Sequence, residues 1–206
     1  MFLTERYHTS EMSMYELRNA EFESAFAFGK TGENAVLAWL RQKKFSIVPV
    51  TNIENTETYG DGKKRGPRVL LPDGEEMIAP DLLVYRAGNV RWVEVKRKSG
   101  WVYFHKLGIW ETGIDTFMLK KYADLASQSP WPVWMLFLQD NMMTKKQPAG
   151  VKTPDRGLYG QDVKSLIRKE NQCGTWGGMT YWTPDAFRFL ATWDEVMSFV
   201  VDHGKG

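Results

Sequence analysis

Residues 80–96 read Pro-Asp-Leu-Leu-Val-Tyr-Arg-Ala-Gly-Asn-Val-Arg-Trp-Val-Glu-Val-Lys, which is two apolar runs separated by turn residues. Residues 81–85 and 90–95 are each typical of a β-strand, and Gly88-Asn89 between them favours a two-residue hairpin turn. The stretch therefore predicts an antiparallel hairpin, and the flanking segments predict how its sheet is completed.

The turn decides which side chains share a face of this hairpin. With Gly88-Asn89 as the turn, Asp81 lies opposite Lys96, and because side chains alternate along a strand, Asp81, Glu94 and Lys96 project from one face. The other face is apolar and carries Leu82, Val84, Val93 and Val95. A three-residue turn would instead place Asp81 and Glu94 on opposite faces.

Further strands are predicted on both sides of the hairpin. Residues 45–50 and 68–71 read as strands, the second closed by the turn Pro72-Asp73-Gly74. Residues 132–138 form an almost wholly apolar run, which predicts a central strand buried on both faces.

Two helices are predicted from apolar residues that recur at helical spacing. The first stripe comprises Glu33, Val36, Leu37 and Leu40, and the second comprises Ile114, Phe117, Met118, Tyr122 and Leu125. A capping box at residues 192–195 predicts a short C-terminal helix carrying Val196, Phe199 and Val200 and ending at Gly204. Residues 179–182 predict a last strand, and residues 183–185 predict the start of a helix. This order predicts an α/β fold with a mixed sheet.

Composition bounds the class of protein. The chain has 206 residues, 43% hydrophobic and 25% charged, which predicts one folded domain over residues 1–206. Lys and Arg number 27 against 25 Asp and Glu, so the net charge of +2 gives no global argument for a polyanionic partner. Any nucleic-acid site must therefore come from local clusters.

The inventory of ligating residues excludes two classes of site. A single cysteine, Cys173, excludes an intramolecular disulfide, and three scattered histidines exclude a Cys/His zinc cluster of usual spacing. A metal ion, if one binds, would be held by oxygen. The first residues lack the pattern of a signal peptide and no apolar run is long enough to span a membrane, so a cytoplasmic protein with no membrane partner is expected.

Two carboxylates and one ammonium thus converge at one end of the hairpin, with opposed Cβ atoms expected at about 4.5–5.5 Å. Mg²⁺ binds through one or two carboxylates together with water and phosphate oxygens. A lysine beside them could pair with a phosphate, or orient or deprotonate a water molecule. The alternative interpretation is a surface hairpin with ordinary charges and a cross-strand salt bridge.

Pro80-Asp81, followed after a strand and turn by Glu94-Val95-Lys96, resembles the PD-(D/E)xK nuclease motif. That superfamily includes restriction endonucleases, archaeal Holliday-junction resolvases and phage recombination exonucleases. The resemblance covers about residues 28–140, with residues 141–206 as a C-terminal extension, and implies a restriction-endonuclease-like αβββαβ core with a mixed central sheet flanked by helices.

The resemblance also implies roles for individual residues. Asp81, Glu94 and the main-chain carbonyl of Val95 would hold Mg²⁺ or Mn²⁺, and Lys96 matches the catalytic lysine. Glu33 resembles the glutamate that many members carry on the first helix, where it joins the catalytic or metal site. The alternative for Glu33 is an acid that complements a helix dipole.

Tyr122 matches only half of another family pattern. Some members carry Gln-x-x-x-Tyr on the second helix, but Met118 stands at the Gln position here, so that motif is not supported. Tyr122 is then either near the site or a tyrosine of the core.

Basic and aromatic residues alternate after the hairpin in residues 97–115, which reads as a long connection suited to phosphate contact and base stacking. A glycine-rich basic loop at residues 59–67 could add phosphate contacts. The predicted nucleic-acid contacts are Arg97, Lys98, Trp101, Tyr103, His105, Lys106, Lys121, Tyr122, Lys63, Lys64 and Arg65. His105 and Asp115 could also enter a metal shell. The alternatives are a solvated loop, a small aromatic core and structural polar residues.

Together these features predict a Mg²⁺-dependent endodeoxyribonuclease that hydrolyses DNA phosphodiester bonds with a metal-activated water and, by resemblance, leaves a 5′-phosphate. Family distribution favours a phage or mobile-element origin, and a homodimer stays open because many relatives dimerise. The alternatives are a noncatalytic nucleic-acid-binding module on the same fold and a protein-interaction module.

Overall fold

A six-stranded sheet forms the centre of the computed structural model, which describes residues 14–50, 57–58, 64–65, 67–141 and 149–199. The helices are α1 (Met14–Gln42), α2 (Thr116–Gln128), α3 (Val163–Leu166) and α4 (Trp193–Met197), with short 3-10 turns η2 (Lys169–Asn171) and η3 (Pro184–Ala186). The first strands are β1 (Ser46–Pro49), β2 (Glu57–Thr58), β3 (Lys64–Arg65), β4 (Arg68–Leu70), β5 (Glu76–Ile78), β6 (Leu82–Arg86) and β7 (Asn89–Lys98). The later strands are β8 (Val102–Phe104), β9 (Ile109–Asp115), β10 (Val133–Gln139), β11 (Gly157–Asp162), β12 (Gly174–Trp176), β13 (Met179–Trp182) and β14 (Arg188–Thr192).

The central sheet has the order β1-β6-β7-β10-β11-β14 and is mixed. Strands β7 and β10 are parallel, and the other neighbours in this sheet are antiparallel. The parallel pair needs a crossover, which α2 provides. The predicted mixed sheet flanked by helices is confirmed, and α1, β1, β6, β7, α2 and β10 follow each other in the predicted αβββαβ order.

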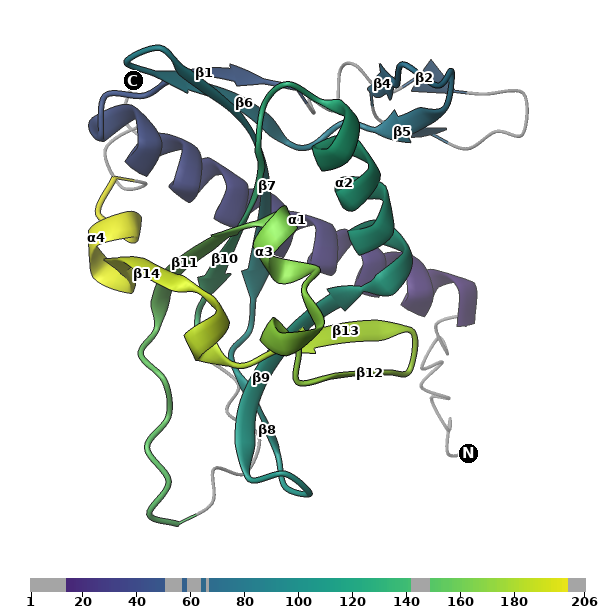
Figure 1. Ribbon diagram of the computed structural model, residues 1–206. Helices are drawn as coiled ribbons and strands as arrows, with labels where there is room; N and C mark the ends of the chain where they lie inside the picture. The colour runs from purple at the N-terminus through teal and green to yellow at the C-terminus, as the bar shows by residue number, and fades with distance from the viewer. Residues whose placement is uncertain (1–13, 51–56, 59–63, 66, 142–148, 200–206) are drawn as a thin grey trace, which may run out of the picture.

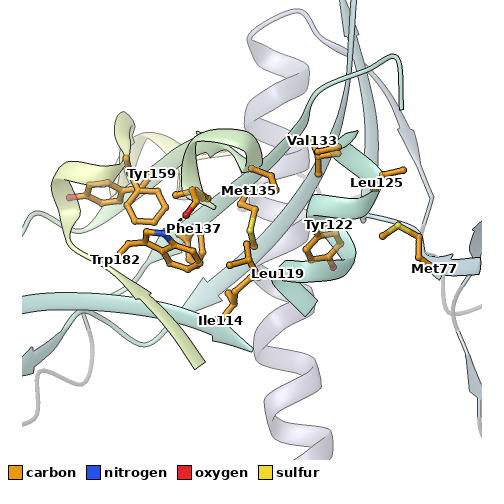
Figure 2. Close-up of a cluster of buried hydrophobic side chains, with 14 of the residues drawn as sticks. Met77, Ile114, Leu119, Tyr122, Leu125, Val133, Met135, Phe137, Tyr159 and Trp182 are labelled. Atoms are coloured by element: carbon orange, nitrogen blue, oxygen red, sulfur yellow. Dashed lines mark hydrogen bonds between the residues drawn. The ribbon is translucent and has the colours of Figure 1, made fainter. Parts of the chain in front are cut away.

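Helices lie over both faces of this sheet (Figure 1), and each face carries a cluster of buried apolar side chains. On one face, Val36 and Leu40 of α1 pack with the predicted apolar residues of the hairpin: Leu82, Val84, Val93 and Val95. On the other face, α2 and α3 pack over β10, where Figure 2 shows Tyr122 and Leu119 near Met135 and Phe137. The predicted central strand at β10 is confirmed, because nearly all its residues are buried.

The hairpin turn differs by one position from the predicted one. The pair Arg86↔Asn89 closes the ladder, so the turn is Ala87-Gly88, and both residues have positive φ, 49° and 81°. A two-residue turn with two positive φ values favours glycine at its second position, and Gly88 takes that place. The predicted turn at Gly88-Asn89 and the predicted pairing of Asp81 with Lys96 were therefore wrong.

The predicted faces nevertheless hold. The observed register moves the partner of each β6 residue by two positions along β7, and a shift of two leaves every side chain on its own face. Continuing the ladder one step beyond Leu82↔Val93 brings Glu94 opposite Asp81, with Lys96 on the same face.

Residues 97–115 are not a long connection, as the sequence had suggested. They complete β7 and then form the hairpin β8–β9, and β9 pairs with β13 in a second sheet of order β12-β13-β9-β8. Basic and aromatic residues that alternate have the two-residue period of a β-strand. Here this period reflects the strands β8 and β9.

The second helix begins later than its predicted stripe. Ile114 belongs to β9, and Asp115 caps α2 by accepting hydrogen bonds from the amides of Phe117 and Met118 at 2.7 and 3.3 Å. Phe117 is 65% exposed, so the buried side of α2 is formed by Leu119, Tyr122, Leu125 and Ala126.

The C-terminal part of the chain completes both sheets. Strand β13 follows the predicted range 179–182, but it is not the last strand, because β14 comes after it. Thr192 caps α4 as predicted, with its hydroxyl accepting from the Glu195 amide at 3.2 Å. Val200 and Gly204 lie outside the described residues. No helix in the described ranges is both long and apolar enough to cross a membrane.

The observed turn makes a stability prediction. Ala87→Gly should raise the free energy of unfolding by about 1 kcal/mol, because alanine resists positive φ, whereas Gly88→Ala should lower it by about 1 kcal/mol. Urea denaturation of both variants measures the two effects. A loss of stability in Ala87→Gly would contradict the observed turn.

Candidate active site

Asp81 lies where β6 and β7 stop pairing. The last ladder pair is Leu82↔Val93, and beyond it the Val95 amide donates to the Asp81 side chain, with 2.8 Å between nitrogen and Oδ2. The Asp81 main-chain carbonyl accepts from the amide of Val50, also at 2.8 Å. The carboxylate of Asp81 thus takes the place that a backbone carbonyl would occupy in a continued ladder.

The carbonyl of Val95 points toward the same gap. Along β7, Trp92 donates its amide to Pro132 and Lys98 accepts from Asp140, so these even-numbered residues direct their backbone groups toward β10. Odd-numbered Val95 directs its amide toward Asp81. Because the N–H and C=O groups of one strand residue point to the same side, the Val95 carbonyl also faces the side of Asp81.

Glu94 is a buried carboxylate held by two side chains. It is 3% exposed, it forms an ion pair with Lys96, and it accepts a hydrogen bond from the Tyr122 hydroxyl of α2. Lys96 keeps 37% of its side chain exposed, so its ammonium joins the buried acid to solvent. The predicted cluster of Asp81, Glu94 and Lys96 on one face is thus present.

Burial and neighbouring charge shift the proton affinities of this cluster. Burial, followed by the charge of Glu94, raises the pKa of Asp81 to about 7. Burial alone would lower the pKa of Lys96, but the charges of Glu94 and Asp81 outweigh it and hold that pKa above its usual value. Lys96 is therefore a stable cation, and the sequence-based alternative in which it deprotonates water is disfavoured.

Glu33 lies on α1, near this cluster. Its carboxylate pairs with Lys30 at 3.0 Å and its side chain is 26% exposed. After burial and Glu94, its charge also contributes to the raised pKa of Asp81. Glu33 therefore acts on the cluster at least through its electric field.

The donor set fits a hard cation. Asp81 and Glu94 supply two negative charges against the single positive charge of Lys96, and the pKa of Asp81 is raised because that excess is buried. In the described part of the chain, no group of three or more His, Cys, Asp or Glu side chains is arranged to hold a metal ion. A cation here would then need backbone oxygen, such as the Val95 carbonyl, and water.

Three of the predicted DNA contacts occupy buried or paired positions. Arg97 projects to the opposite face, where it pairs with Asp140 and lies 3.9 Å from the Phe28 ring centroid. Trp101 and Tyr122 are each 1% exposed and belong to the core. These positions indicate that Trp101 and Tyr122 pack in the core and that Tyr122 also holds Glu94.

Two other predicted contacts, Lys98 and Lys121, are each held by a partner. Lys98 continues the face of Lys96, and its ammonium donates to the Gly113 carbonyl at 2.7 Å. Burial, then the charge of Lys96, lowers the pKa of Lys98 to about 8. Lys121 pairs with Glu75 at 3.3 Å.

The β8–β9 hairpin carries the remaining described contacts. Tyr103 is half-buried against the rings of His105 and Trp110, and His105 and Lys106 are exposed at the hairpin tip. Lys64 and Arg65 belong to β3, and Lys63 lies outside the described residues. Asp115, which the sequence suggested for a metal shell, is instead the cap of α2.

The bond between Tyr122 and Glu94 is what sequence reasoning missed. The sequence predicted that Tyr122 is either near the site or a tyrosine of the core. In the structure it packs in the core and also forms a hydrogen bond with Glu94. The only available signal was its place on the inward side of the second helix with a polar tip, because no pattern in the sequence ties α2 to β7.

Comparisons with protein-family models and with curated proteins gave no match. Among solved structures, the chain is similar to Hjc, a Holliday junction resolvase from the archaeal hyperthermophile Archaeoglobus fulgidus. The two chains are 11% identical, with a TM-score of 0.43 over 77% of this chain and 91% of that one. A likeness of this extent carries no argument about activity.

The raised pKa of Asp81 predicts how stability depends on pH. Its carboxyl has a pKa of about 7 in the fold, above the ordinary aspartate value of 3.8, so the folded chain binds more protons than the unfolded chain between these two values. The contribution of Asp81 to stability should therefore be largest below pH about 4 and should decrease by up to about 4 kcal/mol as pH rises to 7 and above.

Asp81→Asn removes that titration. Urea denaturation in buffer with EDTA measures the free energy of unfolding of the variant and of the wild type. The difference, variant minus wild type, should increase by a few kcal/mol as pH is raised from 4 to 8. Asp124→Asn, an exposed change on α2, is the matched control and should follow the wild type. Parallel profiles for wild type and Asp81→Asn would contradict the raised pKa.

Proposed function

We propose that this protein is a metal-dependent nuclease that hydrolyses DNA phosphodiester bonds and leaves a 5′-phosphate. One observation carries the proposal: Asp81, Glu94 and Lys96 meet on one face where β6 and β7 diverge, with the Val95 carbonyl directed into the same gap. Oxygen donors beside a fixed cation suit the transfer of a phosphoryl group.

Asp81, Glu94 and the Val95 carbonyl would hold Mg²⁺ or Mn²⁺. The excess negative charge on the two carboxylates supports a divalent cation, and the rigid β7 backbone supports the carbonyl as a ligand. When bound, such an ion supplies charge neutralisation at phosphate oxygens and lowers the pKa of water.

Lys96 would bind the scissile phosphate as a cation. Its raised pKa keeps the ammonium charged at neutral pH, and its partial exposure lets it reach a substrate while its stem stays on β7. The charge would stabilise the additional negative charge that develops on the phosphate oxygens. Glu94, held from the other side by Tyr122, fixes the position of this ammonium.

Glu33 would support the same centre from α1. Its charge adds to the negative potential at Asp81, and its pairing with Lys30 balances that charge at the surface. We assign Glu33 to positioning rather than to direct contact with the phosphate.

DNA would follow the surface that begins at Lys96 and continues over Lys98 to the exposed tip of the β8–β9 hairpin. His105 and Lys106 at this tip, and Lys121 on α2, would contact phosphates. Lys64 and Arg65 in β3 are a second candidate segment, and Lys63 beside them completes the predicted basic loop.

A protein-interaction function is the second candidate, and one observation favours it. On the face of the sheet opposite Glu94, Trp39, Phe45, Val84 and Leu190 help to line an apolar pocket beside Trp134. A partner that inserted an apolar side chain there would bind with little dependence on salt, unlike DNA. The noncatalytic DNA-binding alternative differs only in lacking cleavage.

Cleavage tests the proposal directly. Wild-type protein should cut labelled DNA in Mg²⁺ or Mn²⁺ and not in EDTA, with 5′-phosphate ends that a ligase accepts. Lys96→Ala should lower the cleavage rate at least about 100-fold, because it removes a charge aimed at the phosphate. Lys120→Ala, an exposed change on α2, is the control. DNA binding with no cleavage in any metal would favour the binding module.

Metal binding should depend on pH through Asp81. Because the cation must displace a proton whose pKa is about 7, Mn²⁺ affinity should rise about fivefold between pH 6 and pH 7, about tenfold between pH 6 and pH 8, and level off above pH 8. Isothermal titration calorimetry in buffers of different ionisation enthalpy measures both the affinity and the released proton. Asp81→Asn should bind Mn²⁺ weakly at every pH, and an equal affinity in wild type and variant would exclude Asp81 as a ligand.

A further inference from the structure

Three aromatic rings form a parallel stack on the second sheet. Phe104 of β8 stacks on Trp176 of β12 with centroids 4.9 Å apart and planes 23° apart, and Trp176 stacks on Tyr181 of β13 at 4.6 Å and 16°. The other ring pairs of the described residues cross at 52° to 86°. We call Phe104, Trp176 and Tyr181 the aromatic stack.

Two glycines lie beneath the aromatic stack. A Cβ atom at Gly174 would overlap the Trp176 ring, and a Cβ at Gly113 would lie 2.7 Å from Cδ1 of Tyr181. The two glycines therefore let the rings pack closely on the backbone. All three rings are half-buried, so the stack is fixed from below and still reaches solvent.

The aromatic stack is joined to the candidate active site through Gly113. Gly113 pairs with Tyr181 across β9 and β13, and its carbonyl accepts from the Lys98 ammonium at 2.7 Å. Lys98 in turn lies on the same face of β7 as Lys96 and Glu94. Lys98 and Gly113 thus connect the aromatic stack to the strand that carries Glu94 and Lys96.

The hairpin that carries Phe104 extends away from the six-stranded sheet (Figure 1). Its tip exposes His105 and Lys106, and Leu107 there is 53% exposed. Residues 99–110 contain no acidic side chain. An apolar residue beside a lysine on a projecting element is an arrangement with which proteins enter between bases while holding phosphates.

We propose that the aromatic stack and the β8–β9 tip bind unpaired nucleotides next to a duplex, which makes forked DNA the preferred substrate. An aromatic ring can stack on a base of any sequence. Bases inside a duplex are already stacked on their neighbours and cannot reach such a ring, so the rings select unpaired nucleotides. The inference rests on the proposed nuclease function, because it names the substrate class of that site.

Binding is measured in EDTA, so that it is independent of cleavage. The probes are a blunt duplex and a fork of the same sequence with 2-aminopurine in one unpaired arm, both labelled with fluorescein. Wild type should bind the fork about tenfold more tightly than the duplex and should quench 2-aminopurine, since one stacked base accounts for about that factor.

Two variants locate the site. Trp176→Ala and Phe104→Leu should each weaken fork binding about tenfold, abolish the quenching and leave duplex binding unchanged. Phe104→Leu keeps an apolar side chain on the hairpin, so it tests the ring even if Trp176→Ala fails to fold. Phe189→Ala is the matched control, because Phe189 is also exposed and packs over a glycine, but it lies on β14.

Each outcome is decisive for one of the two ideas. Equal affinity for fork and duplex, or quenching that survives in Phe104→Leu, would overturn the stacking site even if the enzyme cuts duplex DNA in Mg²⁺. Fork preference and quenching that depend on Phe104 would support the stacking site, and absence of cleavage of that bound fork in Mg²⁺ or Mn²⁺ would overturn the nuclease proposal alone.

Discussion

The hydrogen bond from the Val95 amide to the Asp81 carboxylate is the contact on which the candidate site depends. It marks the point where β6 leaves β7, and it replaces a strand partner with an ionisable side chain. The divergence opens a gap at one edge of a rigid central strand, and the Val95 carbonyl faces the same gap. Without this divergence, Glu94 and Lys96 would be ordinary members of a continuous sheet.

The candidate site is also constrained by the burial of the negative charges of Glu94 and Asp81. Glu94 lies in the core beneath α2, where Tyr122 and Lys96 supply its partners, and its charge together with burial raises the pKa of Asp81. A fold that keeps two such carboxylates together loses stability unless a positive charge joins them. Lys96 supplies one positive charge, and under the proposed function a divalent cation would supply the remainder.

The faces of the hairpin were predictable because their pattern has period two. Although the turn was placed one residue late, Asp81, Glu94 and Lys96 stayed together, because the register moved by two positions along β7. The apolar run of β10 and the helical stripe of α1 were equally clear, since burial selects long apolar patterns.

What the sequence could not predict depends on distant packing. Residues 97–115 read as a connection because an alternation of basic and aromatic residues suits DNA contact as well as a strand, and β13, the partner of β9, follows much later in the chain. Tyr122 could not be assigned to Glu94, nor Trp176 to Phe104, because each pair joins segments that meet only in the folded molecule. The most direct measurement of the central claim is the anomalous difference map of crystals grown with Mn²⁺. The account predicts one peak bounded by the carboxylates of Asp81 and Glu94 and the carbonyl of Val95, and a well-ordered site with no peak there at saturating Mn²⁺ would contradict it.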